Sequence, residues 1–254
     1  MTKSKIFKVI VFLLALALGI GVFILAINTC TLEKEVKTEG YFQYIVVGEN
    51  SRVANCNNRE VVAIVGFTNS GLEQEVIEIP RTIDGKPVQR IGYEDALCNE
   101  RYNVYSENLK KVYIHDNIRY IRYFQNKDLS ENESRVSLMF CSINDSLSMY
   151  NTMSVKDVYY YKSLIDTIDI NRTLLPANIV FMNNYSDEIN DGYYRLDNIE
   201  TGETIPPPPD PTREGYAFTG WYTEAECANK WDFNIAPEIE EDTEFRLYAG
   251  WRAI

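Results

Sequence analysis

The sequence is poor in the residues on which most catalytic and metal sites depend. It has one histidine, His115, among 254 residues, and five cysteines that lie far apart and form no Cys-x-x-Cys pair. Zinc sites need close pairs of cysteine or histidine ligands, so we predict no metal site. A glycine-rich phosphate loop, a His-Glu-x-x-His motif and a Gly-x-Ser-x-Gly motif are also absent from the sequence. We therefore name no catalytic, cofactor-binding or metal-binding residue, and we expect a protein that is not an enzyme and has no cofactor.

Positive charge is scarce as well. The chain has 25 lysines and arginines against 37 aspartates and glutamates, which gives a formal net charge of −12. An acidic surface repels phosphate backbones, so we expect no nucleic-acid partner.

A few side chains still have catalytic chemistry. Glu224 and Glu226, and the acidic run 240–242, could serve as a carboxylate pair of a glycosidase. They fall in a C-terminal segment of about 45 residues, which we expect to be too small to enclose a cleft, so we interpret them as solvated charge. We likewise interpret His115 as a surface turn residue. The odd number and wide spacing of the cysteines define no disulfide framework, and we interpret them as small buried side chains.

The longest apolar run covers residues 9–27 and carries no charge. As an α-helix that rises about 1.5 Å per residue, it spans about 28 Å, close to the hydrocarbon thickness of a bilayer. Lys3, Lys5 and Lys8 precede it, and such a basic flank stays in the cytoplasm. We therefore predict a cytoplasmic basic tail over 1–8, a transmembrane helix over 9–27, a juxtamembrane spacer over 28–40, and an ectodomain outside the cell membrane.

Two other interpretations of this segment stay open. In a lipoprotein, Cys30 would carry the lipid, although Ile27, Asn28 and Thr29 differ from the small residues that usually precede such a cysteine. A cleaved signal peptide usually has a shorter apolar stretch and an Ala-x-Ala site, which does not follow here. All three interpretations deliver the remaining chain to the same compartment.

From residue 41 to 185 the chain shows short alternating apolar segments. Residues 76–80, 109–114 and 155–160 alternate with a period of two, as half-buried strands do. Matching segments follow downstream at 88–92 and 118–121. A strand, a turn and a second short strand that recur in this way indicate a stacked solenoid, in which neighbouring units share one core.

Residues 79–92, IPRTIDGKPVQRIG, followed by Ala96 and Leu97, resemble the BspA-like leucine-rich repeats of bacterial surface proteins. Residues 109–121 resemble a second unit, in which His115 stands where the family usually has proline. Residues 162–164 and 179–181 resemble a degenerate closing unit. The resemblance implies a short leucine-rich-repeat-like β solenoid over 41–185.

Residues 186–209 are polar and end in four prolines, which favour an extended polyproline rod, so we predict a linker. The segment that follows reads PTREGYAFTGWY at 211–222 and closes on LYAGW at 247–251. It is similar to the Listeria–Bacteroides repeat, or internalin B-repeat, which implies a small β-grasp-like module over 210–254. Gly250 departs from the family, which usually has a long side chain there.

Aromatic residues are frequent in this C-terminal segment. They can form a compact core in a unit too small for an aliphatic one, and we expect that core to contain Trp221, Tyr222, Trp231, Phe233, Tyr248 and Trp251. Gly215 and Gly220 lie where turns or close backbone contacts are expected.

Together these features predict a mainly β protein with an N-terminal transmembrane helix. The two resemblances imply a membrane-anchored bacterial cell-surface protein for recognition or adhesion, whose partner is a protein or glycan on a host or neighbouring cell. A structural envelope spacer is the alternative, and an envelope hydrolase is a further one.

Overall fold

The computed structural model describes residues 34–48, 60–95, 100–125, 136–140, 148–150, 155–161, 174–185, 192–240 and 242–254. The predicted basic tail, the predicted transmembrane helix over 9–27 and Cys30 lie outside these residues. Within the part that is described, no helix is both long enough and apolar enough to cross a membrane.

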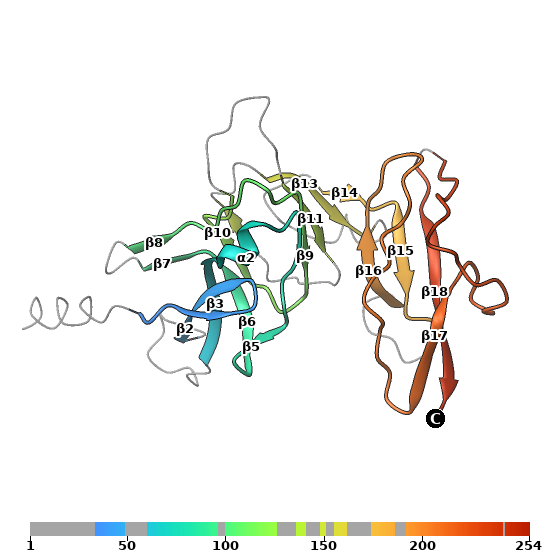
Figure 1. The fold of residues 1–254 in the computed structure, drawn as a ribbon, viewed down its shortest axis with the longest axis horizontal. Helices are drawn as coiled ribbons and strands as arrows, with labels where there is room; N and C mark the ends of the chain where they lie inside the picture. Colours follow the sequence, from blue (N-terminus) through green and yellow to red (C-terminus); the bar gives the residue numbers. More distant parts are fainter. Residues whose placement is uncertain are drawn as a thin grey trace, which may run out of the picture.

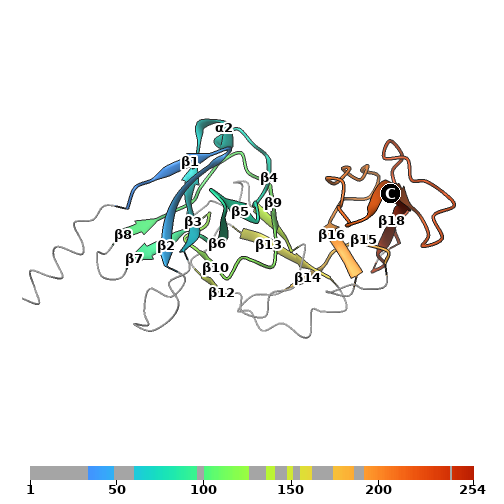
Figure 2. The same ribbon diagram turned by 90° about the horizontal axis from the view of Figure 1, so that it is seen from below.

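The described chain is mainly β and arranges its strands in several sheets, which Figures 1 and 2 show as two adjacent bodies. The described residues between 34 and 161, together with residues 175–176, form the larger body. The smaller body contains the C-terminal strands. A single helical turn, α2 (Asn69–Leu72), lies on the larger body, and Thr68 caps it by accepting a hydrogen bond from the backbone N–H of Gly71.

The first sheet is built from β1 (Lys37–Glu39), β2 (Phe42–Gly48), β3 (Glu60–Phe67), β5 (Thr82–Ile83), β6 (Lys86–Ile91), β10 (Tyr120–Arg122) and β12 (Ser148–Tyr150). Strands β1, β2 and β3 pair antiparallel, whereas β3, β6, β10 and β12 pair in parallel. Strands β5 and β6 form a tight hairpin whose turn residues, Asp84 and Gly85, both have positive φ, as an Asp-Gly turn favours. A small antiparallel pair, β7 (Tyr93–Asp95) and β8 (Glu100–Tyr102), follows this sheet.

The second sheet contains only parallel pairs. Its strands run in the order β14 (Leu175–Pro176), β13 (Val155–Tyr160), β11 (Val136–Phe140), β9 (Lys111–Ile114) and β4 (Val76–Glu78). The chain alternates between the two sheets, because β4, β9, β11 and β13 enter the second sheet and β6, β10 and β12 enter the first. The strands predicted at 76–80, 88–92, 109–114, 118–121 and 155–160 are therefore confirmed as β4, β6, β9, β10 and β13.

Close contact between successive parallel strands requires glycine at one position. Gly92 has a φ of +72°, and a Cβ added there would lie 1.5 Å from the carbonyl oxygen of Arg122. Any other residue would push β6 and β10 apart. This glycine belongs to the Ile-Gly pair of the resembling repeat segment.

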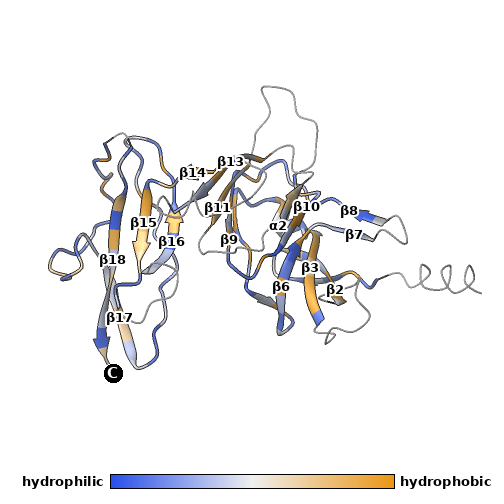
Figure 3. Cartoon of the chain, turned by 180° about the vertical axis from the view of Figure 1, so that it is seen from behind, coloured by the Kyte–Doolittle hydropathy of each residue, from blue (hydrophilic) through white to orange (hydrophobic). Residues whose placement is uncertain are grey.

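The third sheet runs in the order β16 (Tyr193–Asp197), β15 (Ile179–Met182), β18 (Phe245–Ala253) and β17 (Tyr216–Tyr222). Strands β15 and β18 are parallel, although a long stretch of chain separates them. The sheet thus starts before the predicted 210–254 module and takes β15 from the expected closing unit and β16 from the expected linker. The physical reason is packing, since Ile179 and Phe181 are buried in the same core as Trp221 and Leu247. Figure 3 shows the apolar character of β15 in orange.

The predicted aromatic core of the C-terminal segment is largely confirmed. Trp221 is 3% exposed and contacts the rings of Phe181, Tyr194 and Phe218 at centroid distances of 4.9, 5.9 and 5.4 Å. Trp231, Phe233 and Trp251 pack partly buried against the same cluster. Tyr222 and Tyr248, by contrast, are half-buried and do not belong to this cluster.

Two glycines shape the β17–β18 hairpin. Gly220 has a φ of +132° and pairs with Gly250 at a bulge. A Cβ at Gly250 would lie 2.4 Å from both the Tyr222 ring and the Thr219 hydroxyl oxygen. The departure from the family pattern at 250 is thus explained by the space that these two side chains occupy.

Candidate functional site

A charged residue of β16 attaches the third sheet to the second. Arg195 is 7% exposed, and its Nη1 donates a hydrogen bond to Glu78 Oε2 at 2.6 Å. Its guanidinium carbon lies 3.4 Å from the centroid of the Tyr113 ring, a cation–π contact. The other oxygen of Glu78 lies 2.8 Å from His115 Nε2. One carboxylate of β4 therefore joins β16 to the end of β9.

A second charged residue of β16, Asp197, also makes contacts with the second sheet. Asp197 is 1% exposed and accepts hydrogen bonds from Lys111 Nζ at 2.5 Å and from the Tyr113 hydroxyl at 2.7 Å. The backbone N–H of Asn198 is a third donor, at 2.7 Å. A buried carboxylate needs such partners, because desolvation otherwise costs several kcal/mol. Arg195, Asp197 and their partners on β4 and β9 are called the polar junction below.

The contacts of the polar junction shift the pKa values of Glu78 and Tyr113. Burial alone would raise the pKa of Glu78, but the hydrogen bond with His115 and the charge of Arg195 outweigh it and lower that pKa to about 2. Burial and the neighbouring Asp197 carboxylate raise the pKa of Tyr113 above its usual value. Glu78 is therefore ionised and Tyr113 is neutral at neutral pH, which suits the ion pair and the hydrogen bond that they form.

The expectation that His115 is a surface turn residue holds for the turn, because the carbonyl oxygen of His115 accepts a hydrogen bond from the N–H of Ile118 at 3.2 Å, but not for the surface position of its side chain. Its side chain is 12% exposed and pairs with Glu78. The reason is that the end of β9 lies beside β4. The only hint in the sequence was a polar residue at a position where the resembling repeats usually have proline.

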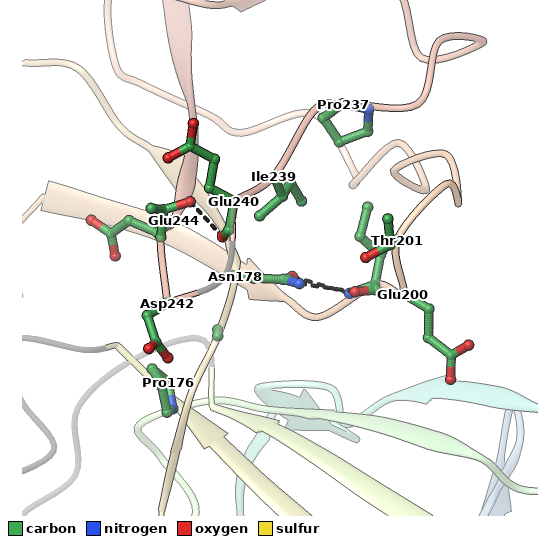
Figure 4. Close-up of a pocket in the computed structure, with 12 residues that line it drawn as sticks. Pro176, Asn178, Glu200, Thr201, Pro237, Ile239, Glu240, Asp242 and Glu244 are labelled. Atoms are coloured by element: carbon green, nitrogen blue, oxygen red, sulfur yellow. Dashed lines mark hydrogen bonds between the residues drawn. The ribbon is translucent and has the colours of Figure 1, made fainter.

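A groove lies where the third sheet meets the end of β14 (Figure 4). Asn178 forms part of its wall, since its side chain exchanges two hydrogen bonds with the backbone of Ile199, at 2.8 and 3.1 Å. These bonds tie the start of β15 to the segment after β16. Residues 237–240 and 242–244, which precede β18, line the groove from another side. Two adjoining hollows of about 400 and 650 Å³ share Thr201, Pro237, Ile239, Glu240 and Thr243, and together they are called the junction groove.

Acidic side chains surround the junction groove, and apolar ones line it. The carboxylates belong to Glu200, Glu238, Glu240, Asp242 and Glu244. The apolar lining consists of Pro176, Ala177, Ile199, Ala236, Pro237 and Ile239. Among the described residues that line the groove, none is basic. Glu244 Oε1 accepts from Arg246, whereas Glu244 Oε2 is buried and accepts no hydrogen bond from any described residue.

The acidic residues that the sequence singled out at 224–226 and 240–242 lie in different places in the structure. Glu224 binds its own loop, because its Oε1 accepts from the backbone N–H groups of Ala228 and Asn229. Glu240 and Asp242 line the junction groove, and Glu241 lies outside the described residues. The C-terminal segment does not enclose this groove alone, because residues 176–178 and 199–201, which precede it in the sequence, complete the lining. Within the described chain, no three acidic, histidine or cysteine side chains could hold a metal ion.

The comparison with known protein families finds a match in the smaller body. Residues 178–249 match the model of the Listeria-Bacteroides repeat domain. These residues form a Listeria-Bacteroides repeat domain. The match begins at Asn178, in the wall of the junction groove, and so includes β15 and β16 together with the β17–β18 hairpin.

The repeat domain suggests a bacterial surface protein and a cell-surface location. The family comparison gives no evidence for BspA-like leucine-rich repeats, so the resemblance of residues 41–185 to that family stays a prediction. Cys227 is the one cysteine within the described residues, and its thiol is free.

Proposed function

We propose that this chain is a membrane-anchored bacterial cell-surface protein that recognises or adheres to a protein or glycan partner through non-catalytic modules. The repeat domain at 178–249 carries this proposal, because it suggests a surface location. The apolar run at 9–27, with three lysines before it, supplies the proposed anchor. A lipid anchor at Cys30 is the alternative.

In this proposal the body formed by residues 34–161 is a short leucine-rich-repeat-like solenoid. The alternation of the chain between two sheets supports it, since β6, β10 and β12 pair in parallel in one sheet and β4, β9, β11 and β13 in the other, and each turn of a solenoid adds one strand to each face. The repeat domain closes one end of this stack as a β-grasp-like module, with β16 held by the polar junction.

We propose a non-catalytic role because the strongest candidate for acid–base chemistry is already engaged. His115 pairs with Glu78, whose second oxygen is bound by Arg195. A general base must be able to reach a substrate proton, and this arrangement uses the imidazole Nε2 and both carboxylate oxygens inside the protein.

A structural envelope spacer is the second candidate. It is favoured by the polar junction, which fixes the repeat domain to the preceding body through Arg195–Glu78 and Lys111–Asp197. A spacer needs such rigidity but no ligand.

Protease treatment of intact cells that express the chain with a C-terminal tag tests the location. We expect the tag to be lost while cytoplasmic markers stay intact; protection of the tag would refute the surface assignment. A Cys30→Ser variant separates the anchors, because only a lipoprotein would lose its membrane retention.

Binding of expressing cells to arrays of host and bacterial proteins and glycans separates recognition from a spacer role. Selective retention on one class supports recognition, and equal retention of expressing and non-expressing cells favours the spacer. Covalent labelling of the purified chain by hydrolase probes would contradict the non-catalytic role.

A further inference from the structure

We infer that the junction groove binds a basic peptide segment of a partner protein. This inference rests on the proposed recognition function and names the chemical class of its partner. It starts from the size of the groove, whose two adjoining hollows of about 400 and 650 Å³ share residues of the segment 237–240. Hollows of this size have room for several side chains, which a peptide supplies and a single small ion does not.

The walls of the groove are held by the framework of the repeat domain. Asn178 is tied to Ile199 through its side chain and to the N–H of Phe245 through its carbonyl oxygen, at 2.8 Å. The turn after Ile199 is closed by Glu203, whose carboxylate accepts from the N–H of Glu200 at 2.9 Å. A preformed groove binds a peptide with less loss of entropy than one that must first be ordered.

The chemistry of the lining selects positive charge. Figure 4 shows Glu240, Asp242 and Glu244 on one side of the pocket and Glu200 on the other, with Ile239 between them. An apolar centre with a charged rim is the usual anatomy of a protein–protein interface. A lysine can lay its methylene stem on Ile239 and Pro237 and hold its ammonium group against a rim carboxylate.

The test uses the full chain in non-ionic detergent and a short fluorescein-labelled peptide in which lysine and alanine alternate. Fluorescence anisotropy should show binding that weakens as salt is added. Glu240→Gln should weaken the affinity by about two- to fivefold, the usual size of an exposed ion pair. Glu240→Lys should weaken it by about tenfold, because it places like charges together.

Glu214→Lys is the matched control. Glu214→Lys changes the net charge by the same amount as Glu240→Lys. Glu214 is exposed, and it lies at the end of the β17–β18 hairpin that is far from the junction groove. Strand β18 separates the two ends by nine residues, or about 30 Å. We expect Glu214→Lys to change the affinity by less than about twofold, since the separation exceeds the Debye length at physiological salt.

Several results would overturn the inference. These are an absence of peptide binding, equal weakening by Glu214→Lys, or equal binding of a peptide in which glutamate replaces lysine. Displacement by spermidine at the same concentration of positive charge would assign the groove to small polyamines instead. Failure of the surface assignment is read separately, from the protease treatment of intact cells, and does not depend on peptide binding.

Discussion

The two bodies of the molecule fill their cores with different side chains. The buried cluster that fills the larger body consists largely of valine, isoleucine and leucine from the first two sheets, with phenylalanine and tyrosine rings among them, and it extends to Val180, Tyr193 and Leu196 of the third sheet. In the repeat domain, tryptophan and phenylalanine rings dominate, and Trp221 lies at the centre of their contacts. All three tryptophans of the chain belong to this second core or pack against it.

The difference follows from how many strands share each core. A stack of short parallel strands distributes burial over many branched side chains, which suit the pleated surface of a sheet. A domain of few strands must fill the same kind of volume with fewer side chains, and rings supply the most buried area for each residue. The repeat domain should therefore be more sensitive to the loss of one side chain than the larger body.

Among the changes considered, truncation of the Trp221 ring should have the largest effect on the free energy of unfolding. Trp221→Ala removes a side chain that contacts three other rings and should lower the free energy of unfolding by about 3–5 kcal/mol. Urea denaturation followed by the fluorescence of Trp231 and Trp251 measures it. Trp221→Phe, which keeps a ring, should cost clearly less, and a loss below about 1 kcal/mol for the alanine variant would contradict the proposed core.

A matched truncation in the larger body should cost less. Ile121 is fully buried between β6 and β12, and Ile121→Ala should lower the free energy of unfolding by about 2–4 kcal/mol. Far-UV circular dichroism in urea measures the change, with Ile121→Val as the milder control at about 0.5–1.5 kcal/mol. If Ile121→Ala cost more than Trp221→Ala, the contrast between the two cores would fail.

The sequence predicted the features that depend on neighbouring residues. Alternation of apolar residues at 76–80 and 155–160 indicates strands, because the side-chain period of a strand is two. The ring pattern of 211–251 likewise indicates an aromatic core. These signals are local and need no knowledge of chain topology.

The polar junction and the junction groove could not be predicted in this way. Glu78 and Arg195 are 117 residues apart, and each is an ordinary charged residue in its own segment. The groove needs the ends of β14, β16 and the approach to β18 together, and the sequence assigned these to three different regions. Only the pairing of β15 with β18 brings them to one place.

Breaking the polar junction tests whether the two bodies unfold together. Arg195→Met removes the guanidinium that pairs with Glu78, and because Glu78 is 34% exposed we expect a loss of about 1–3 kcal/mol in the free energy of unfolding, below the value for a fully buried pair. Tryptophan fluorescence reports the repeat domain alone, whereas circular dichroism reports both bodies. The two unfolding curves should coincide in the natural chain and separate in the variant.

Arg81→Met is the control for this change. Arg81 pairs with Asp116 on the surface, where both side chains are exposed, and its loss should cost between about 0 and 1 kcal/mol. If Arg81→Met separated the two curves as Arg195→Met does, the separation would not be due to the loss of the polar junction.

Low pH should also weaken the polar junction, with a smaller loss in the free energy of unfolding than Arg195→Met causes. The pKa of Glu78 is lowered from its ordinary value of 4.5 to about 2, so its ionised form stabilises the folded state. That contribution is complete above about pH 4.5 and is lost as the pH falls through about 2. Chemical denaturation between pH 5 and pH 2 measures it, and a Glu78→Gln variant should show a shallower decline over this window. An unchanged decline in the variant would assign the acid sensitivity to other carboxylates.

The parallel pairing of β15 with β18 gives the repeat domain a particular response to mechanical force. Tension applied between the start of β15 and the end of β18 pulls two adjacent parallel strands in opposite directions along their length. The hydrogen bonds from Ile179 to Met182 with Phe245 to Tyr248 then carry the load together instead of opening one after another. Strand β18 is also bonded along its other edge to β17, so it cannot slide without breaking both rows. The domain is built to resist shear along the line that joins its first strand to its last.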